Sequence, residues 1–290
     1  MMNKHAYLVI AHNEFEVLKV LLQLLDYPKN DIYLHIDSKV DDFDEQLFVS
    51  CVKKARLYIL RNRISVTWGD YSQIECELRL LEEAVPKNYS YYHLLSGVDL
   101  PIKPQNVIYD FFESSQKQFV HFDSEILDDY YLKRVNKYWF IKGRNKSFFQ
   151  KLINRVLLTL QFPINRVKKS GLSYQKGANW FSITNGFAQY LVSNRALIEK
   201  TFKYTLCGDE MFLQTLIMCS PYKDEIYMQK ASDDYRSIQR EIDWKRGDPY
   251  IFRKDDFEFL KSSELMFARK FSWNIDSEIV CMLMKQNRID

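Results

Sequence analysis

Polar side chains follow three apolar segments of the chain, at the points where strands are expected to end. His12 and Asp37 follow the first two segments, at 7–11 and 31–36, and Asp99 comes shortly after the third. In an open α/β sheet the carboxyl ends of parallel strands face one crevice, and ligands bind there. We therefore expect these side chains to line a crevice for a polar ligand.

Several common catalytic motifs are absent from the sequence. No G-x-G-x-x-G follows the first apolar segment and no G-x-x-x-x-G-K-[ST] occurs, which disfavours dinucleotide-dependent oxidoreductases and P-loop enzymes. The G-x-S-x-G and H-E-x-x-H motifs of hydrolases and metalloproteases are missing as well. Asp42 and Asp44 have the Asp-x-Asp spacing of a metal site. They lie in an acidic run before an expected helix, where a solvated cap is the better interpretation.

Alternating strands and helices are expected to position these residues. Continuous apolar runs indicate buried parallel strands, and apolar residues at helical spacing indicate helices. We expect strands at residues 7–11, 31–36, 56–60, 91–95, 119–122 and 180–183. We expect helices at residues 15–25, 72–84, 104–112, 185–193, 209–218 and 254–262. This order predicts an α/β fold, with an open mixed sheet flanked by helices.

Length and composition favour one compact domain. The chain has 290 residues, of which 47% are hydrophobic, and it holds only 8 Gly and 7 Pro, which excludes disordered and low-complexity classes. Its 5 cysteines show no C-x-x-C spacing, so we expect a reducing, cytoplasmic compartment. The apolar run near the N-terminus is too short for a signal segment or a membrane anchor.

Residues 133–170 form a strongly basic segment. It contains eleven Lys or Arg and no Asp or Glu, although the net charge of the whole chain is only +3. Bulky apolar residues are interleaved with the basic ones at 148–160, which favours a helix lying on an anionic membrane surface. A solvated basic helix packed on the acidic body is the plainer alternative. Nucleic-acid binding is disfavoured, because no nucleic-acid module accompanies the segment.

Six sequence blocks stand in a specific order. They are Tyr-Leu-Val-Ile-Ala-His at 7–12, Leu-His-Ile-Asp-Ser-Lys at 34–39, Ser-Val-Thr-Trp-Gly at 65–69, Tyr-Tyr-His-Leu-Leu-Ser-Gly-Val-Asp-Leu-Pro-Ile-Lys at 91–103, Gly-Asp-Glu at 208–210 and Leu-Met-Phe-Ala-Arg-Lys-Phe at 265–271. Together they resemble the Core-2/I-branching glycosyltransferase family, which includes peptide O-xylosyltransferases. The resemblance implies a GT-A type fold and an inverting transfer of GlcNAc or xylose from a UDP-sugar to an acceptor hydroxyl, without a metal.

The resemblance implies that Glu210 is the catalytic base. Inverting transfer needs a carboxylate that takes the proton of the attacking hydroxyl, and Glu210 matches the family's catalytic glutamate. Without the resemblance, the plainer interpretation is structural: Asp209 caps the helix expected at 209–218 and Glu210 complements its dipole.

The resemblance also implies how the donor is bound. Lys270 matches the family's diphosphate-binding lysine and Arg246 lies near its second cation, so protein cations would stabilise the leaving diphosphate. Asp37 matches the aspartate that contacts uridine, and His12 matches the histidine after the first strand. Trp68 matches an aromatic position beside the nucleotide.

On the acceptor side, Trp180 resembles an aromatic residue whose ring can stack on a sugar. Asp99 would contact a substrate or cap its own turn. The single domain then divides into a nucleotide-binding half at 1–125, a basic insertion at 126–175, and an acceptor and catalytic half at 176–290.

The sequence therefore predicts a bacterial-type glycosyltransferase in the cytoplasm, peripheral on the inner face of the membrane. Its acceptor would be a glycan or lipid-linked glycan in surface polysaccharide or glycolipid synthesis. No metal, other cofactor or nucleic-acid partner is expected. Two alternatives stay open: a metal-dependent GT-A transferase that uses Asp42 and Asp44, and a carbohydrate-binding or membrane-adaptor protein without turnover.

Overall fold

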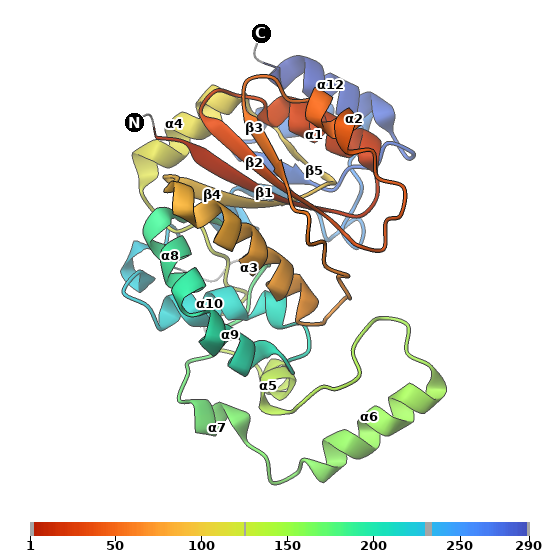
Figure 1. Ribbon diagram of the computed structural model, residues 1–290, viewed down its shortest axis with the longest axis vertical. Helices are drawn as coiled ribbons and strands as arrows, with labels where there is room; N and C mark the ends of the chain where they lie inside the picture. The colour runs from red at the N-terminus through yellow and green to blue at the C-terminus, as the bar shows by residue number, and fades with distance from the viewer. Residues whose placement is uncertain (1–2, 125, 230–233, 289–290) are drawn as a thin grey trace.

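Two β-sheets and their covering helices build the protein, in a computed structural model that describes residues 3–124, 126–229 and 234–288 (Figure 1). The larger sheet has the strand order β3-β2-β1-β4-β6. Its strands are β1 (His5–Ala11), β2 (Asn30–Ile36), β3 (Arg56–Ile59), β4 (Tyr91–Ser96) and β6 (Ser182–Thr184). The first four run parallel and β6 pairs antiparallel with β4. The predicted open mixed sheet is confirmed.

A smaller sheet begins just after β4. Its order is β5-β8-β7, with β5 (Asp99–Pro101), β8 (Phe267–Arg269) and β7 (Arg240–Ile242). The buried Arg240 connects the two sheets, because its guanidinium donates to the carbonyl oxygens of Leu94 and Phe181 at 2.8 and 3.0 Å. Burial lowers the pKa of Arg240 to about 9.

Helices cover both faces of the larger sheet, so two apolar cores form. Successive side chains of a strand point to opposite faces. Tyr7 and Val9 therefore pack with α1 (Phe15–Leu25), α4 (Gln105–Ser115) and α12 (Ser277–Asn287). Ala6 and Leu8 pack with α3 (Ser72–Ala84), α8 (Asn185–Ser193) and α10 (Phe212–Met218). Burial on both faces explains why β1 is apolar without interruption.

The other helices lie between these elements. The α-helices are α2 (Glu45–Ser50), α5 (Asp129–Asn136), α6 (Phe148–Leu160), α7 (Arg166–Ser170), α9 (Arg195–Phe202) and α11 (Phe257–Ser262). The 3-10 helices are η1 (Val85–Lys87), η2 (Gly208–Glu210), η3 (Lys223–Glu225), η4 (Arg236–Ile238) and η5 (Lys254–Asp256). α6 lies apart from the sheets and their covering helices (Figure 1). Within the described ranges no helix has the length and apolar character needed to cross a bilayer.

The strand expected at 119–122 does not form. Gln118 pairs with Ile226 and Phe119 with Ser182, each as an isolated bridge. Because these two neighbours bond to different segments, no continuous ladder extends along the chain. The strand expected at 180–183 is shorter and shifted, as β6.

The helix expected at 209–218 begins later than predicted, and Asp209 does not cap it. Residues 208–210 form the 3-10 turn η2, and α10 begins at Phe212 with Met211 as its N-cap residue and no side-chain cap. The helix expected at 254–262 likewise divides into η5 and α11. The turn at η2 brings Glu210 out of the helix and into the site described next.

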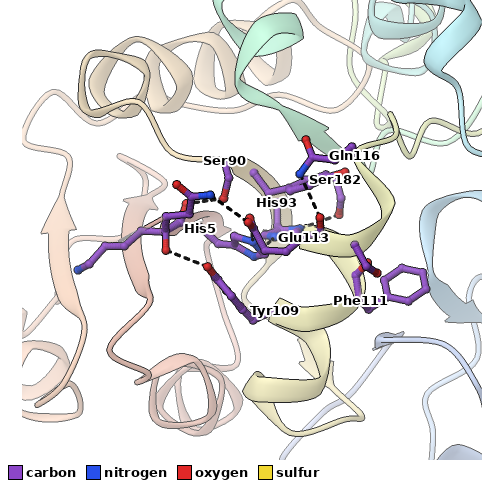
Figure 2. Close-up of polar contacts among 12 residues, drawn as sticks. His5, Ser90, His93, Tyr109, Phe111, Glu113, Gln116 and Ser182 are labelled. Carbon is purple, nitrogen blue, oxygen red and sulfur yellow. Dashed lines mark hydrogen bonds and ion pairs between the residues drawn. The ribbon is translucent and has the colours of Figure 1, made fainter. Parts of the chain in front are cut away.

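A row of polar side chains, buried except for Glu113, lies near the start of β1 (Figure 2). Glu113 of α4 contacts His5 at 3.2 Å, His5 contacts His93 of β4 at 3.0 Å, and His93 contacts Ser182 of β6 at 2.8 Å. Burial lowers the pKa of both histidines. Both imidazoles are therefore neutral at physiological pH.

Candidate active site

The ends of β1, β2 and β4 meet at one edge of the larger sheet. The amide of Asp37 donates to the carbonyl of Ala11 at 2.9 Å, and the amide of Gly97 donates to that of Ile10 at 2.9 Å. A Cβ atom on Gly97 would lie only 2.7 Å from the Cβ of Ala11, so glycine is required for this close approach. This edge places the residues after the three strands beside one another.

Asp37 is a buried carboxylate that holds the loop after β3. It accepts hydrogen bonds from the amides of Lys39 at 2.9 Å and Val66 at 3.1 Å, and the Lys39 ammonium lies 3.0 Å away. Burial opposes ionisation, but these hydrogen bonds outweigh it and lower the pKa of Asp37. The carboxylate is thus ionised at neutral pH, and it fixes the segment that leads to Trp68.

His12 and Lys270 lie at the same edge. Partial loss of hydration lowers the pKa of His12, the charge of Asp37 opposes this, and the charges of Lys39 and Lys270 lower the pKa further. The ammonium of Lys270 makes no hydrogen bond or ion pair with any residue that the structure describes. Its positive charge is therefore available to an anionic ligand beside His12 and Asp37.

Arg246 is already paired within its own loop. Its guanidinium forms ion pairs with Asp243 and, at 2.7 Å, with Asp256, and it lies 3.9 Å from the ring centroid of Tyr250. These two carboxylates raise its pKa. Arg246 would have to release one of these carboxylates in order to bind a diphosphate.

Asp99 and Trp180 contact each other directly. The indole Nε1 of Trp180 donates to Oδ2 of Asp99 at 3.0 Å, and Arg269 pairs with Oδ1 at 2.7 Å. The amide and hydroxyl of Ser96 also donate to this carboxylate, at 2.8 and 3.0 Å, so Asp99 does hold its own turn. Asp99 is buried, and these contacts let its carboxylate position Trp180 and Arg269.

Glu210 has one carboxylate oxygen bound and the other open. Oε2 lies 2.9 Å from the guanidinium of Arg134, on α5, and 3.7 Å from the ammonium of Lys176. Oε1 has no hydrogen-bond partner among the residues described, and the side chain is 37% exposed. The two cations fix the orientation of Glu210 while an oxygen remains accessible to a ligand.

A short segment before β6 joins Glu210 to Asp99. The amide of Gly177 donates to the carbonyl of Glu210 at 2.9 Å, and Trp180, three residues later, bonds to Asp99. Three Cα steps span at most about 11 Å. A Cβ atom on Gly177 would lie 1.8 Å from the carbonyl oxygen of His121, so only glycine fits there. The main chain at Glu210 therefore lies near Trp180, which contacts the strand-end residue Asp99.

The loop of Trp68 reaches the same region. The carbonyl of Gly69 accepts a hydrogen bond from the amide of Cys207 at 3.0 Å, just before the turn that carries Glu210. The ring of Trp68 is 53% exposed, and the guanidinium of Arg144 lies 5.6 Å from its centroid. Trp68 is thus placed to offer an aromatic face at the rim of the site.

Two further carboxyl groups near this turn, those of Asp209 and Glu77, have raised pKa values, and no role was predicted for Glu77. Burial raises the pKa of Asp209 to about 7, and the charge of Glu210 adds to this. Burial also raises the pKa of Glu77, on α3, to about 8, against hydrogen bonds from Gln73 and Asn179. Glu77 is therefore largely protonated at neutral pH. The sequence does indicate this burial, because Glu77 lies among Ile74, Leu78 and Leu81 on the apolar face of α3.

The cationic partners of the site were also missed. Arg134 is one of eleven basic residues in the segment 133–170, and nothing in the sequence distinguishes it from the others. For Lys176, the only local signal is the glycine that follows it, Gly177. Arg269 could have been predicted as a site residue, because it directly precedes Lys270 in the sixth sequence block.

No three His, Cys, Asp or Glu side chains come together in a metal-binding group within the described ranges. Of the Asp-x-Asp pair, Asp44 caps α2 by accepting a hydrogen bond from the amide of Leu47 at 3.2 Å, as the capping interpretation predicted. Asp42 is exposed.

Comparison with known proteins finds relatives that are named xylosyltransferases. The Core-2/I-Branching enzyme family model matches residues 5–261, and the chain belongs to this family. The resemblance seen in the six sequence blocks is confirmed. An enzyme is thereby favoured over a carbohydrate-binding or adaptor protein.

The similarity to individual proteins is distant. "Xylosyltransferase sqv-6" of Caenorhabditis briggsae is 26% identical over 93% of this chain and 35% of the relative. "Xylosyltransferase oxt" of Drosophila melanogaster is 24% identical over 91% of this chain and 31% of the relative. The chain thus spans about a third of the length of these curated relatives. The crystal structure of apo mouse xyloside xylosyltransferase 1 matches with a TM-score of 0.40 and 11% identity, over 92% of this chain and 97% of that one.

Proposed function

We propose that the protein is an inverting glycosyltransferase that moves GlcNAc or xylose from a UDP-sugar to an acceptor hydroxyl, with Glu210 as the general base. The observation that carries this proposal is the carboxylate of Glu210: Oε2 is held 2.9 Å from Arg134, and Oε1 is open. A base needs one oxygen free to accept a proton, and it needs a fixed orientation.

The reaction is a single displacement. The acceptor oxygen attacks the anomeric carbon from the side opposite the diphosphate, and its proton passes to Oε1 of Glu210. The bond between that carbon and the diphosphate oxygen breaks, and the electron pair leaves with UDP. Attack from the opposite side inverts the configuration of the sugar. The negative charge that develops on the diphosphate must then be stabilised by a nearby cation.

Lys270 supports the donor half of the proposal. Its ammonium is unpaired among the residues described and lies beside His12 and Asp37, where an anionic leaving group can meet it. In this scheme Asp37 contacts the uridine, Trp68 lies beside the nucleotide, and no metal is required. Arg246 joins the diphosphate only if it leaves one of its carboxylate partners.

Trp180 supports the acceptor half. Its indole N–H is bound to Asp99 and Arg269 lies 4.3 Å from its ring centroid, so the ring is held in place by these two residues. A fixed aromatic face favours stacking of a pyranose ring. The acceptor we propose is a glycan or lipid-linked glycan in bacterial surface polysaccharide or glycolipid synthesis, reached from the cytoplasm. All five cysteines are free, which agrees with a reducing compartment.

Replacement of Glu210 by Gln tests the proposal. Gln keeps the size and one hydrogen-bond acceptor but takes up no proton, so kcat should fall by about 100-fold or more while the Kd for UDP stays unchanged. Glu83→Gln, on the exposed side of α3, is the matched control and should transfer sugar normally. Normal turnover by Glu210→Gln would exclude this residue as the base.

A further inference from the structure

The helix α6 carries its apolar side away from the protein. Phe148 and Phe149 are 75% and 73% exposed. Further exposed apolar side chains on or just after this helix are Leu152, Ile153, Val156, Leu160 and Phe162. A surface helix of a globular protein normally buries its apolar stripe against the core. The arrangement in α6 is the reverse.

Polar groups attach the other side of α6 to the protein. The amide of Asn154, the one buried side chain of this helix, donates to the carbonyl of Ile141 at 2.8 Å. Just after the helix, the amide of Gln161 donates to the carbonyl of Tyr138 at 3.1 Å. Because Asn154 and Gln161 are two turns apart on the same side, they fix which side of α6 faces outward.

Basic side chains border the apolar side. Lys133 from α5 and Lys146, Lys151 and Arg155 from α6 and its approach line a surface groove, together with Lys137. None of these forms an ion pair with a described carboxylate, and residues 133–170 contain no acid at all. The groove is therefore an uncompensated positive site next to an exposed apolar surface.

We propose that α6 and this groove dock the protein on an anionic lipid bilayer, with the apolar side chains in the interface and the cations among the lipid phosphates. The helix has 13 residues, about 20 Å in length, and bulky apolar groups occupy both of its ends, so it lies flat on the surface. Charge argues against a second copy as the occupant, because pairing two such helices would bring the two basic grooves together.

Docking would bring the membrane close to the active site. Lys133 lines the groove, and the next residue on α5, Arg134, holds Glu210 at 2.9 Å. A glycan carried on a lipid would thus be presented beside the catalytic carboxylate. The docking itself does not depend on the proposed transfer reaction.

Vesicle sedimentation tests the proposal. The protein should sediment with phosphatidylglycerol vesicles and not with phosphatidylcholine vesicles, and high salt should release it. Phe148→Ser/Phe149→Ser should weaken binding about tenfold or more. Lys151→Gln/Arg155→Gln should weaken it about 25-fold, since each cation near an anionic surface contributes about a fivefold gain.

The control variant is Lys53→Gln/Lys117→Gln, which removes the same charge from exposed sites outside the basic segment. It should bind vesicles as the unmodified protein does. Equal loss in the control and in Lys151→Gln/Arg155→Gln would overturn the assignment to this face, as would equal or absent binding to both vesicle types. Self-association that Phe148→Ser/Phe149→Ser abolishes, without vesicle binding, would identify a second copy instead. Donor hydrolysis and thermal unfolding of each variant show whether the active site and the fold are intact.

Discussion

The buried carboxyl group of Glu77 makes stability depend on pH in an unusual direction. Burial raises its pKa from 4.5 to about 8 in the folded protein. Between these two values the folded state holds a proton that the unfolded state has released. The contribution of this group is therefore complete below about pH 4.5, and it is lost as the pH rises towards 8.

The replacement Glu77→Gln removes this dependence. In the folded protein Oε1 of Glu77 accepts a hydrogen bond from Gln73 at 3.0 Å, and the side chain of Asn179 is its other polar contact. Gln keeps the shape and supplies an N–H at every pH. One pKa unit corresponds to about 1.4 kcal/mol, so Glu77 alone should lower the free energy of unfolding by about 3 kcal/mol between pH 5.5 and 8.5.

Urea unfolding of both proteins at these two pH values measures the effect. The free-energy difference between Glu77→Gln and the unmodified protein should shift by about 3 kcal/mol in favour of Gln at the higher pH. Asp209, with its pKa raised to about 7, also titrates in this range and its charge interacts with Glu77, so both proteins should carry Asp209→Asn in this comparison. A difference that is the same at both pH values would show that Glu77 titrates normally, and the account of a buried protonated acid would be wrong.

Three further predictions concern the site. Lys270→Ala should weaken UDP binding by about 1.5 to 3 kcal/mol in calorimetry, because a charge-assisted hydrogen bond is lost, and unchanged affinity would remove Lys270 from the donor site. Transfer should persist in EDTA, and loss that Mn²⁺ restores would favour the metal-dependent alternative. Arg134→Gln should lower kcat about tenfold or more with little change in the Kd for UDP, because Glu210 loses its partner at 2.9 Å; a change confined to UDP binding would contradict this positioning role.

The parts of the fold that the sequence predicted are those with long apolar patterns. Strands β1 and β2 are buried on both faces, so each is a largely apolar run in the sequence. The apolar stripes of α1 and α3 give apolar residues at helical spacing, which is also visible in the sequence. The strands of the smaller sheet have three residues each, which is too short for a period to be recognised. Nothing local marks Arg240 as a buried cation, because its partners Leu94 and Phe181 lie in distant segments.

The candidate site shows the same division. Asp37, His12 and Lys270 were found because strand ends and sequence blocks identify them, and the structure places them at one edge of the sheet. Arg246 was chosen by its place near a block, and its pairing with two carboxylates of its own loop could not be seen at that level. Asp209 was interpreted as a cap because sequence does not reveal burial. In the structure the chain turns before α10, and this turn buries a carboxylate oxygen of Asp209.

The row from Glu113 to Ser182 also determines the tautomers of two histidines. The hydrogen bond to His5 is the main cause that lowers the pKa of Glu113 to about 2, so Glu113 is ionised. An ionised carboxylate can only accept a hydrogen bond, so His5 must carry its proton on Nε2. Nδ1 of His5 then accepts from Nε2 of His93, and Nδ1 of His93 accepts from the hydroxyl of Ser182. All three protons therefore point towards Glu113. The single negative charge of Glu113, on α4, thus sets the direction of the hydrogen bonds across three strands. A neutral amide at position 113 could also donate, which would allow every hydrogen bond in the row to reverse its direction.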